Sequence, residues 1–317
     1  MGVFILRRIA ISIPLLLAIT MVTFAFINLA PGDPVDAMIN PQDQLKAQDL
    51  ERMREALGLN KPIPVRYVIW LGQAAQGNFG YSYSTEQPVL RVIAARMPPT
   101  LELMGAALII STVLGVVFGV LSALHVYSLW DYVLGVLSLV GLSVPSFFFA
   151  LVILDIFAAK LQILPPYGMG SEVGPPSLTD NLTHLILPAT ALSLELIASF
   201  TRYARSAVLE VMRSDFVTTA RAKGLGERTV VWRHIVRNAT IPLITIASLR
   251  LPLLIGGAII IETMFQWPGM GLLSIEAIRS RDYPVLMGLT FLIAALVLAS
   301  NLLADVLYAC VDPRIRV

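Results

Sequence analysis

The chain has 317 residues, of which 56% are hydrophobic and 14% are charged, and its formal net charge is +2. Soluble domains carry about 25% charged residues, so this composition excludes an ordinary soluble protein and predicts an integral membrane protein. The near-neutral charge argues against nucleic acid as a partner, and the single cysteine, Cys310, excludes an internal disulfide. The three histidines lie far apart in the sequence, so we expect no metal site.

Six weakly charged runs are candidates for membrane spans, and the first is long enough to cross about 30 Å of hydrocarbon at about 1.5 Å per residue. They predict an all-α membrane protein with six transmembrane helices, at Ile9–Ala30, Leu103–Leu124, Tyr132–Leu154, Leu185–Thr201, Ala239–Ile261 and Tyr283–Ala304. The first run is longer than the apolar core of a signal peptide, about 7–15 residues. We therefore interpret it as a span rather than as a cleaved signal.

Basic residues in the connecting segments predict how the spans are oriented. Arg7 and Arg8 precede the first span, and Arg314 and Arg316 follow the last, so we expect both termini in the cytoplasm. The segment 31–98 between the first two spans has seven acidic and seven basic residues and is external by alternation. The predicted division is an N-terminal helix (1–30), an external segment (31–98), a five-helix core (99–310) with a cytoplasmic loop (206–240), and a tail (311–317).

The segment Thr201–Thr240 is the one long polar stretch between apolar segments in the second half of the chain. It has eight Lys/Arg residues against three Asp/Glu residues, an excess that predicts a cytoplasmic position. Apolar residues recur at helical spacing over Ser206–Lys223, and Gly224 after two basic residues is a typical helix stop. A second helix is predicted from about Glu227. We expect this connector to bind another protein; a basic loop without a partner is the alternative.

Two sequence features concern helix packing. Gly115 and Gly119 are spaced to allow close approach of a second helix. Pro145 lies inside the third predicted span and Pro252 inside the fifth, so we expect both helices to be kinked.

The connector also carries a pattern that resembles a known family. Its residues Thr218–Gly224 resemble the cytoplasmic loop of ABC importer permeases, in which an EAAxxxG pattern forms the helix that couples to the ATPase. The chain keeps the second alanine, Ala220, and the glycine, and has threonine at the first two positions. This departure, with the later Arg237–Ala239 and Ile241-Pro242, resembles the dipeptide, oligopeptide and nickel branch of the type I importers. Further matches to that branch lie at Leu29–Pro34, Leu57–Leu59 with Pro62, Gly80–Ser82, Pro98–Leu103, Glu262-Thr263 with Trp267–Gly269, Arg281–Pro284 and Asp312–Arg314.

The resemblance implies one permease subunit of a multi-pass importer in a bacterial inner membrane, surrounded by lipid and carrying di- or oligopeptides. Its partners would be a homologous second permease, two cytoplasmic ABC ATPases that bind ATP and Mg²⁺, and an external solute-binding protein facing the loops Asn78–Thr85 and Gln266–Leu272. The chain itself would have no catalytic site and no cofactor. The residues expected to couple it to an ATPase are Asp215, Thr218, Thr219, Ala220, Arg221, Ala222, Lys223 and Gly224.

The lysines show whether the chain has the signature of ATP hydrolysis. A phosphate-binding P-loop requires Gly-Lys followed by Ser or Thr. The four lysines follow Leu, Asn, Ala and Ala, at Lys46, Lys61, Lys160 and Lys223. The energy for transport must therefore come from another chain or from an ion gradient.

Charged residues inside spans are costly and are therefore candidates for function. By helix rise, Glu195 in the fourth span and Arg250 in the fifth lie about 13–15 Å from the cytoplasmic surface, near the midplane. We predict that they line the translocation path, as a pair or as contacts for the terminal charges of a peptide. An ion pair that binds nothing is the alternative. Asp155, near the external end of the third span, and Pro145 are further candidates for the path.

Three alternatives concern the cargo and the source of energy. Uptake of nickel is possible because that branch shares the same patterns, and glutathione is a further candidate cargo. A gradient-driven secondary transporter would need carboxylates at the midplane, often in repeated halves. Glu195 is one such carboxylate, but the sequence has no recognisable inverted repeat, so the connector favours the ATP-driven importer.

Overall fold

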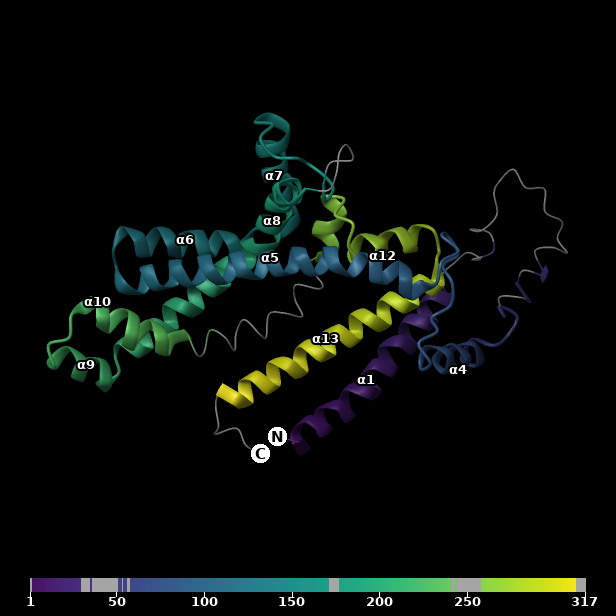
Figure 1. Cartoon of the computed structure of the whole chain (residues 1–317), viewed down its shortest axis with the longest axis horizontal. Coiled ribbons are helices and arrows are strands. Elements are labelled where there is room, and N and C mark those ends of the chain that lie inside the picture. The colour runs from purple at the N-terminus through teal and green to yellow at the C-terminus, as the bar shows by residue number, and fades with distance from the viewer. Residues whose placement is uncertain are drawn as a thin grey trace. The chain divides into compact units, whose positions relative to one another are not determined.

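The computed structural model describes residues 2–29, 35, 51–52, 54–55, 58–170, 177–240, 243 and 258–311. In this part of the chain every regular element is a helix, and a single isolated β-bridge joins Tyr81 to Pro88. The predicted all-α class is confirmed. The elements, drawn in Figure 1, are α1 (Gly2–Leu29), α4 (Ile63–Ala74), α5 (Val89–Leu124), α6 (Leu129–Ser143), α7 (Ser146–Ile153), the π-helix η1 (Leu154–Lys160), α8 (Leu178–Met212), α9 (Asp215–Ala222), α10 (Glu227–Thr229), the π-helix η2 (Val230–Val236), α12 (Met270–Arg279) and α13 (Tyr283–Val311).

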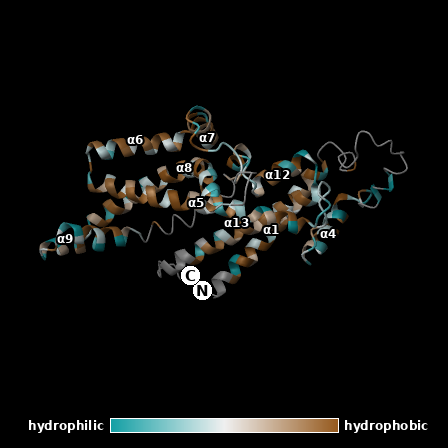
Figure 2. Ribbon diagram, turned by 45° about the horizontal axis from the view of Figure 1, so that its top comes forward, coloured by the Kyte–Doolittle hydropathy of each residue, from teal (hydrophilic) through white to brown (hydrophobic). Residues whose placement is uncertain are grey.

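Within the described residues, four single helices are long and apolar enough to cross a membrane. They lie in α1, α5, α8 and α13 and correspond to the first, second, fourth and sixth predicted spans. Figure 2 shows hydrophobic residues along most of α5 and α6 and hydrophilic ones gathered at α9. The fifth predicted span, Ala239–Ile261, lies mostly outside the described residues. The count of six spans and the cytoplasmic position of both termini therefore stay predictions.

The third predicted span is broken at Pro145, where the sequence predicts only a kink. The chain forms two separate helices there. α6 and the segment formed by α7 and η1 have the length of a span only as a pair, and their axes are bent by 107°. A proline disfavours the helical conformation of the residue before it, and Val144 is accordingly extended (φ −83°, ψ 120°). The carbonyl of Pro145 then accepts the N–H of Phe148 and Phe149, which starts α7.

The chain forms two compact units, residues 1–98 with 268–299 and residues 99–267 with 300–317. In the second unit, α5 and α8 approach each other closely at two glycines, as the sequence predicts. A Cβ atom added to Gly119 would lie 2.6 Å from the carbonyl oxygen of Thr201 and 2.9 Å from the backbone nitrogen of Arg205. One added to Gly115 would lie 3.1 Å from the carbonyl oxygen of Ile197. Only glycine permits this contact, because the backbone of α8 occupies the space of a side chain.

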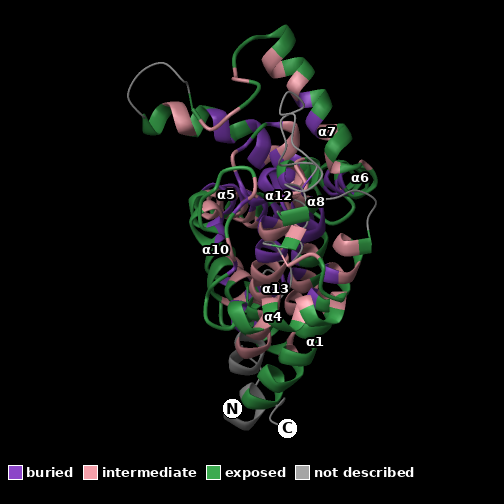
Figure 3. Ribbon diagram, turned by 90° about the vertical axis from the view of Figure 1, so that its right-hand side faces the viewer, coloured by how far each residue is buried: buried purple, intermediate pink, exposed green. Residues whose placement is uncertain are grey.

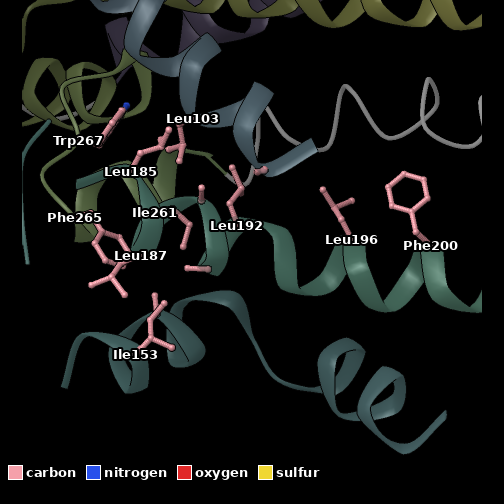
Figure 4. Close-up of a cluster of buried hydrophobic side chains, with 14 residues drawn as sticks. Leu103, Ile153, Leu185, Leu187, Leu192, Leu196, Phe200, Ile261, Phe265 and Trp267 are labelled. Carbon is pink, nitrogen blue, oxygen red and sulfur yellow. The ribbon is translucent and has the colours of Figure 1, made fainter. Parts of the chain in front are cut away.

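An apolar core in the second unit surrounds the first half of α8 (Figure 4). Leu187, Leu192 and Leu196 of α8 lie in it, together with Ile153 of α7. Other buried members are Leu103, Ala107, Ala150, Leu185, Ala189, Ala191, Phe200, Ile261, Phe265 and Trp267. α8 is therefore covered on several sides, whereas Figure 3 shows α1 mainly exposed. An apolar helix with that exposure requires lipid or another subunit around it.

Aromatic contacts hold the first unit together. The Trp70 ring of α4 lies 6.4 Å from Phe24 of α1, 6.3 Å from Phe79 and 6.5 Å from Phe291 of α13, measured between ring centroids. The buried apolar residues beside them are Ala74, Phe79, Val89, Ile93, Met270, Leu273, Ala277, Val285 and Leu289.

Two predicted helix boundaries are wrong. The helix expected over Ser206–Lys223 is divided, because α8 continues to Met212 and α9 begins at Asp215 after Ser214, which is extended (φ −75°, ψ 146°). Ser214-Asp215 is a helix start signal that lies inside an uninterrupted helical pattern, and the start signal prevails. The helix of the second predicted span begins at Val89, well before Leu103, because α5 continues through two prolines.

The α5–α8 contact yields a first prediction. Gly119→Ala should destabilise the protein by about 1–3 kcal/mol, because a methyl group there meets backbone atoms that cannot move independently of α8. Gly105→Ala on the same helix is the matched control, because its added Cβ meets nothing within 4 Å. Thermal unfolding of both purified variants, followed by circular dichroism, measures the difference. Equal midpoints for the two variants would contradict the close contact.

Candidate functional site

α9 is a short helix with one face towards the protein and the other towards solvent. Val217 and Ala220 lie three residues apart, so they share a face, and both are buried. Gly224, with φ of +76°, follows the helix and ends it, which confirms the predicted helix stop.

The buried face of α9 belongs to an apolar cluster that we call the coupling cluster. Its buried members are Val120, Ala123, Val208, Val217, Ala220, Val230, Ile235 and Ala239. They come from α5, α8, α9 and the segment 230–239. The predicted coupling segment is therefore packed against the ends of two predicted spans.

Most of the residues expected to couple the chain to an ATPase lie on the solvent-exposed side of this segment. Seven of the eight are exposed, namely Asp215, Thr218, Thr219, Arg221, Ala222, Lys223 and Gly224. Ala220 is instead buried in the coupling cluster, where a small side chain lets α9 lie close to its neighbours. Phe216, Leu225 and Trp232 are exposed among these polar residues, Trp232 to 63%. Helical spacing predicts Phe216 on the apolar side of the helix with Ala220, and this prediction is wrong because Phe216 is 45% exposed. Exposed aromatic residues such as Phe216 and Trp232 are typical of protein interfaces.

An ion pair closes the turn between α9 and α10. Arg221 Nη2 donates to Glu227 Oε1 at 2.6 Å, and Arg221 Nε donates to Oε2 at 3.3 Å. The hydrogen bond from Arg221 lowers the pKa of Glu227. Both side chains are more than a third exposed, so the pair orients the turn but contributes little to the stability of the fold.

A second ion pair, which the sequence analysis missed, joins α6 to α8. Asp131 in the first turn of α6 accepts hydrogen bonds from Arg205 Nε at 2.8 Å and Nη2 at 2.9 Å, and from the backbone N–H of Tyr127 at 3.0 Å. Ser122 of α5 donates a further hydrogen bond to the same carboxylate. The sequence offered one signal, since Asp131 is the one acidic residue of the short predicted connector between the second and third spans.

The candidates for the translocation path lie in different surroundings. Glu195 is exposed on α8, and Pro145 lies at the break between α6 and α7. Asp155 in η1 lies 2.7 Å from Lys160 Nζ, in an exposed ion pair. Arg250 lies outside the described residues, so its pairing with Glu195 stays a prediction. No group of three His, Cys, Asp or Glu side chains comes together as metal ligands in the described part of the chain.

In the first unit, two short sequence patterns far apart in the chain are hydrogen-bonded to each other. Asp282 accepts hydrogen bonds from Ser82 Oγ at 2.5 Å and from the backbone N–H of Ser84 at 3.2 Å and Val285 at 3.3 Å. Burial and the Asp282 carboxylate raise the pKa of Tyr83 to about 12. The loop before α5 is thereby attached to the start of α13.

A second pair of patterns meets inside the second unit. Thr100 Oγ1 donates to Glu262 Oε1 at 2.7 Å, and Glu262 is completely buried. Trp267 Nε1 donates to the carbonyl oxygen of Pro99 at 2.8 Å. These bonds attach the proline-containing part of α5 to the end of the helical residues 258–264.

Comparisons with known proteins identify the family. The model described as "Binding-protein-dependent transport system inner membrane component" matches residues 115–317, and the model of the N-terminal part of such components matches residues 1–104. The chain belongs to this permease family. The permease is 46% identical to a peptide permease protein of Brucella suis biovar 1, over 98% of both chains. It is 42% identical to the oligopeptide transport system permease protein AppB of Bacillus subtilis, over 100% of both chains. It is 39% identical to the di/tripeptide transport system permease protein DppB of Pseudomonas aeruginosa, over 99% of this chain and 98% of that protein.

Solved structures agree on the fold. The permease matches a structure of the MetNI methionine ABC transporter in an inward-facing conformation with a TM-score of 0.56 and 14% identity, over 70% of this chain and 97% of that one. It matches an amino acid ABC transporter with a TM-score of 0.50, over 68% of this chain and 92% of that one. The permease therefore has the fold of an ABC importer membrane domain and is a multi-pass protein of the bacterial inner membrane. The coupling role of residues 215–224 and the division at residue 98 stay predictions.

The turn after α9 yields a second prediction. Gly224→Ala should destabilise α9 by about 1–2 kcal/mol, because an L-residue is strained at a positive φ, although nothing lies within 4 Å of the added Cβ. Gly226→Ala is the matched control, since Gly226 has equal space but a φ of −60°. Hydrogen exchange of the α9 amides should be faster by about fivefold or more in the first variant alone, as 1 kcal/mol implies. Equal exchange in both variants would rule out backbone strain as the cause.

The Asp282 contacts yield a third prediction. Asp282→Ala removes the acceptor of three donors and should loosen the loop 80–86, at a cost of about 1–3 kcal/mol for each donor left buried. Hydrogen exchange at these residues should increase. Glu86→Gln, on the exposed part of the same loop, should leave the exchange unchanged. If hydrogen exchange of the loop amides in Asp282→Ala is as slow as in the wild type, aromatic packing alone holds the loop in place.

Proposed function

We propose that this permease forms one half of the translocation path of an ATP-driven importer for di- or oligopeptides. A homologous second permease would complete the path, one of two ATPases would bind the exposed side of α9 while the other binds the second permease, and an external solute-binding protein would deliver the peptide. The observation that carries this proposal is the orientation of α9. One face is fixed in the coupling cluster, and seven of the eight expected contact residues are exposed.

The arrangement suits transmission of force from an ATPase. α9 is joined to α8 through the short break Arg213-Ser214, and its turn to α10 is closed by the Arg221–Glu227 pair. Because the coupling cluster includes residues of α5 and α8, a push on α9 would move the ends of both helices. ATP and Mg²⁺ would be bound by the ATPases, and this chain would perform no covalent chemistry. Membership in a binding-protein-dependent family favours this mechanism over an ion gradient.

The cargo is proposed from the relatives. The Brucella, Bacillus and Pseudomonas proteins are named peptide, oligopeptide and di/tripeptide permeases, which favours peptide over nickel and glutathione. Glu195 is exposed on α8, where its carboxylate can form an ion pair with the ammonium group of a peptide. Arg250 is the proposed partner for the carboxylate end.

Uptake by cells that lack the permease gene tests the proposal. Labelled dipeptide, labelled pentapeptide and nickel are compared with and without the gene restored. We expect peptide uptake alone to depend on it, and Thr219→Trp to abolish both uptake and copurification of the ATPases, because an indole would obstruct the exposed side of α9. Gln76→Trp, on an exposed residue of the first unit, is the control that should copurify normally. If nickel uptake alone depends on the gene, nickel replaces peptide as the proposed cargo. If Thr219→Trp copurifies normally with the ATPases, α9 is not the docking site.

A further inference from the structure

The Asp131 carboxylate is held more firmly than a surface ion pair would be. It is 9% exposed and accepts hydrogen bonds from the Ser122 hydroxyl, the Tyr127 backbone and two nitrogens of Arg205. Arginine in this forked arrangement fixes direction as well as distance, which lysine cannot do. Removal of Arg205 would leave the buried Asp131 carboxylate without its opposite charge, whereas the Arg205 side chain is 36% exposed and would stay solvated without Asp131.

These bonds join three helices at one point. Ser122 lies in the last turn of α5, Asp131 in the first turn of α6, and Arg205 in the second half of α8. The helices α6 and α8 also pack closely through small residues. A Cβ added to Gly141 of α6, for example, would lie 3.0 Å from the Cβ of Ala198 on α8. The two hydrogen bonds between Arg205 and Asp131 add a directional constraint to this packing.

The same turns hold the coupling cluster. Ser122 lies between Val120 and Ala123, and Arg205 lies three residues before Val208, and all three apolar residues are buried in that cluster. A displacement of α9 that moves α5 and α8 therefore acts at the point where α6 is attached. α6 in turn leads directly to the 107° break at Pro145.

We propose that Asp131 and Arg205 are positioning residues of the transport cycle. They keep the ends of α5, α6 and α8 together as one body, so that a movement of α9 reaches the broken α6–α7 segment. This inference rests on the proposed function, because it assumes that an ATPase acts on α9. Without the pair, ATP hydrolysis continues but drives less transport.

The first test uses the assembled importer in proteoliposomes and compares peptide uptake with ATP hydrolysis stimulated by the loaded binding protein. In Asp131→Asn, we expect the uptake per ATP hydrolysed to fall about tenfold, the effect of losing a hydrogen-bonded charge, while hydrolysis changes by less than about twofold. Arg205→Lys should have an intermediate ratio, because it keeps the charge and loses the fork. Arg202→Gln, on an exposed residue of the same helix, should keep the wild-type ratio.

The outcomes separate the inference from the proposed function. If the uptake per ATP hydrolysed is unchanged in Asp131→Asn, whether or not both rates fall together, the pair is purely structural and the inference is overturned. A wild-type complex without peptide-stimulated hydrolysis or uptake would instead overturn the proposed function, and the inference with it.

A covalent replacement of the pair is the second test. Asp131→Cys and Arg205→Cys are combined with Cys310→Ser, which removes the one native cysteine. A short bis-methanethiosulfonate reagent then links α6 to α8 through two disulfides, with methanesulfinate as the leaving group at each cysteine. The linked protein should recover most of the uptake per ATP that the unlinked protein lacks, and reduction of the link should abolish the gain. A linked complex that hydrolyses ATP without transport would show that the two helices must separate, and would overturn the inference.

Discussion

The close contact between α5 and α8 is the constraint on which the second unit depends. At Gly119 the backbone of α8 lies where any side chain would be, so the two helices meet at a distance that no other residue permits. That approach sets Ser122 and Arg205 around the same carboxylate, Asp131, and brings the ends of both helices into the coupling cluster. The polar contacts of Asp131 thus lie within about one turn of the place where the two backbones meet at Gly119.

Interruptions of the helices are as important as the contacts between them. Pro145 divides the third span into two helices with very different directions, and Ser214 separates α9 from α8. Each break comes from one or two residues whose backbone preferences oppose a continuous helix. The result is a long, packed helix pair, α5 with α8, followed by short helices that start at these breaks.

The family resemblance receives a physical explanation from pairs of patterns that are distant in sequence. The pattern at Ser82 is bonded to that at Asp282, and the pattern at Thr100 to that at Glu262. Taken one at a time these patterns are weak signals, and nothing in their spacing shows that they are partners. The break at Ser214 was missed for a related reason, since helical periodicity continues through it. The continuation of α5 through Pro98 and Pro99 was missed because prolines usually end a helix.

By itself the sequence determined the all-α membrane class, four of the six spans in the described residues, the glycine contact and the helix stop at Gly224 within the polar connector. These features depend on local composition, on helical period and on the backbone freedom of glycine, all of which can be read within a few turns. Only the tertiary structure decided which face of α9 is buried and that Asp131 meets Arg205. Those facts depend on how α5, α6 and α8 pack together, and a contact between residues 74 positions apart leaves no periodic trace in the sequence.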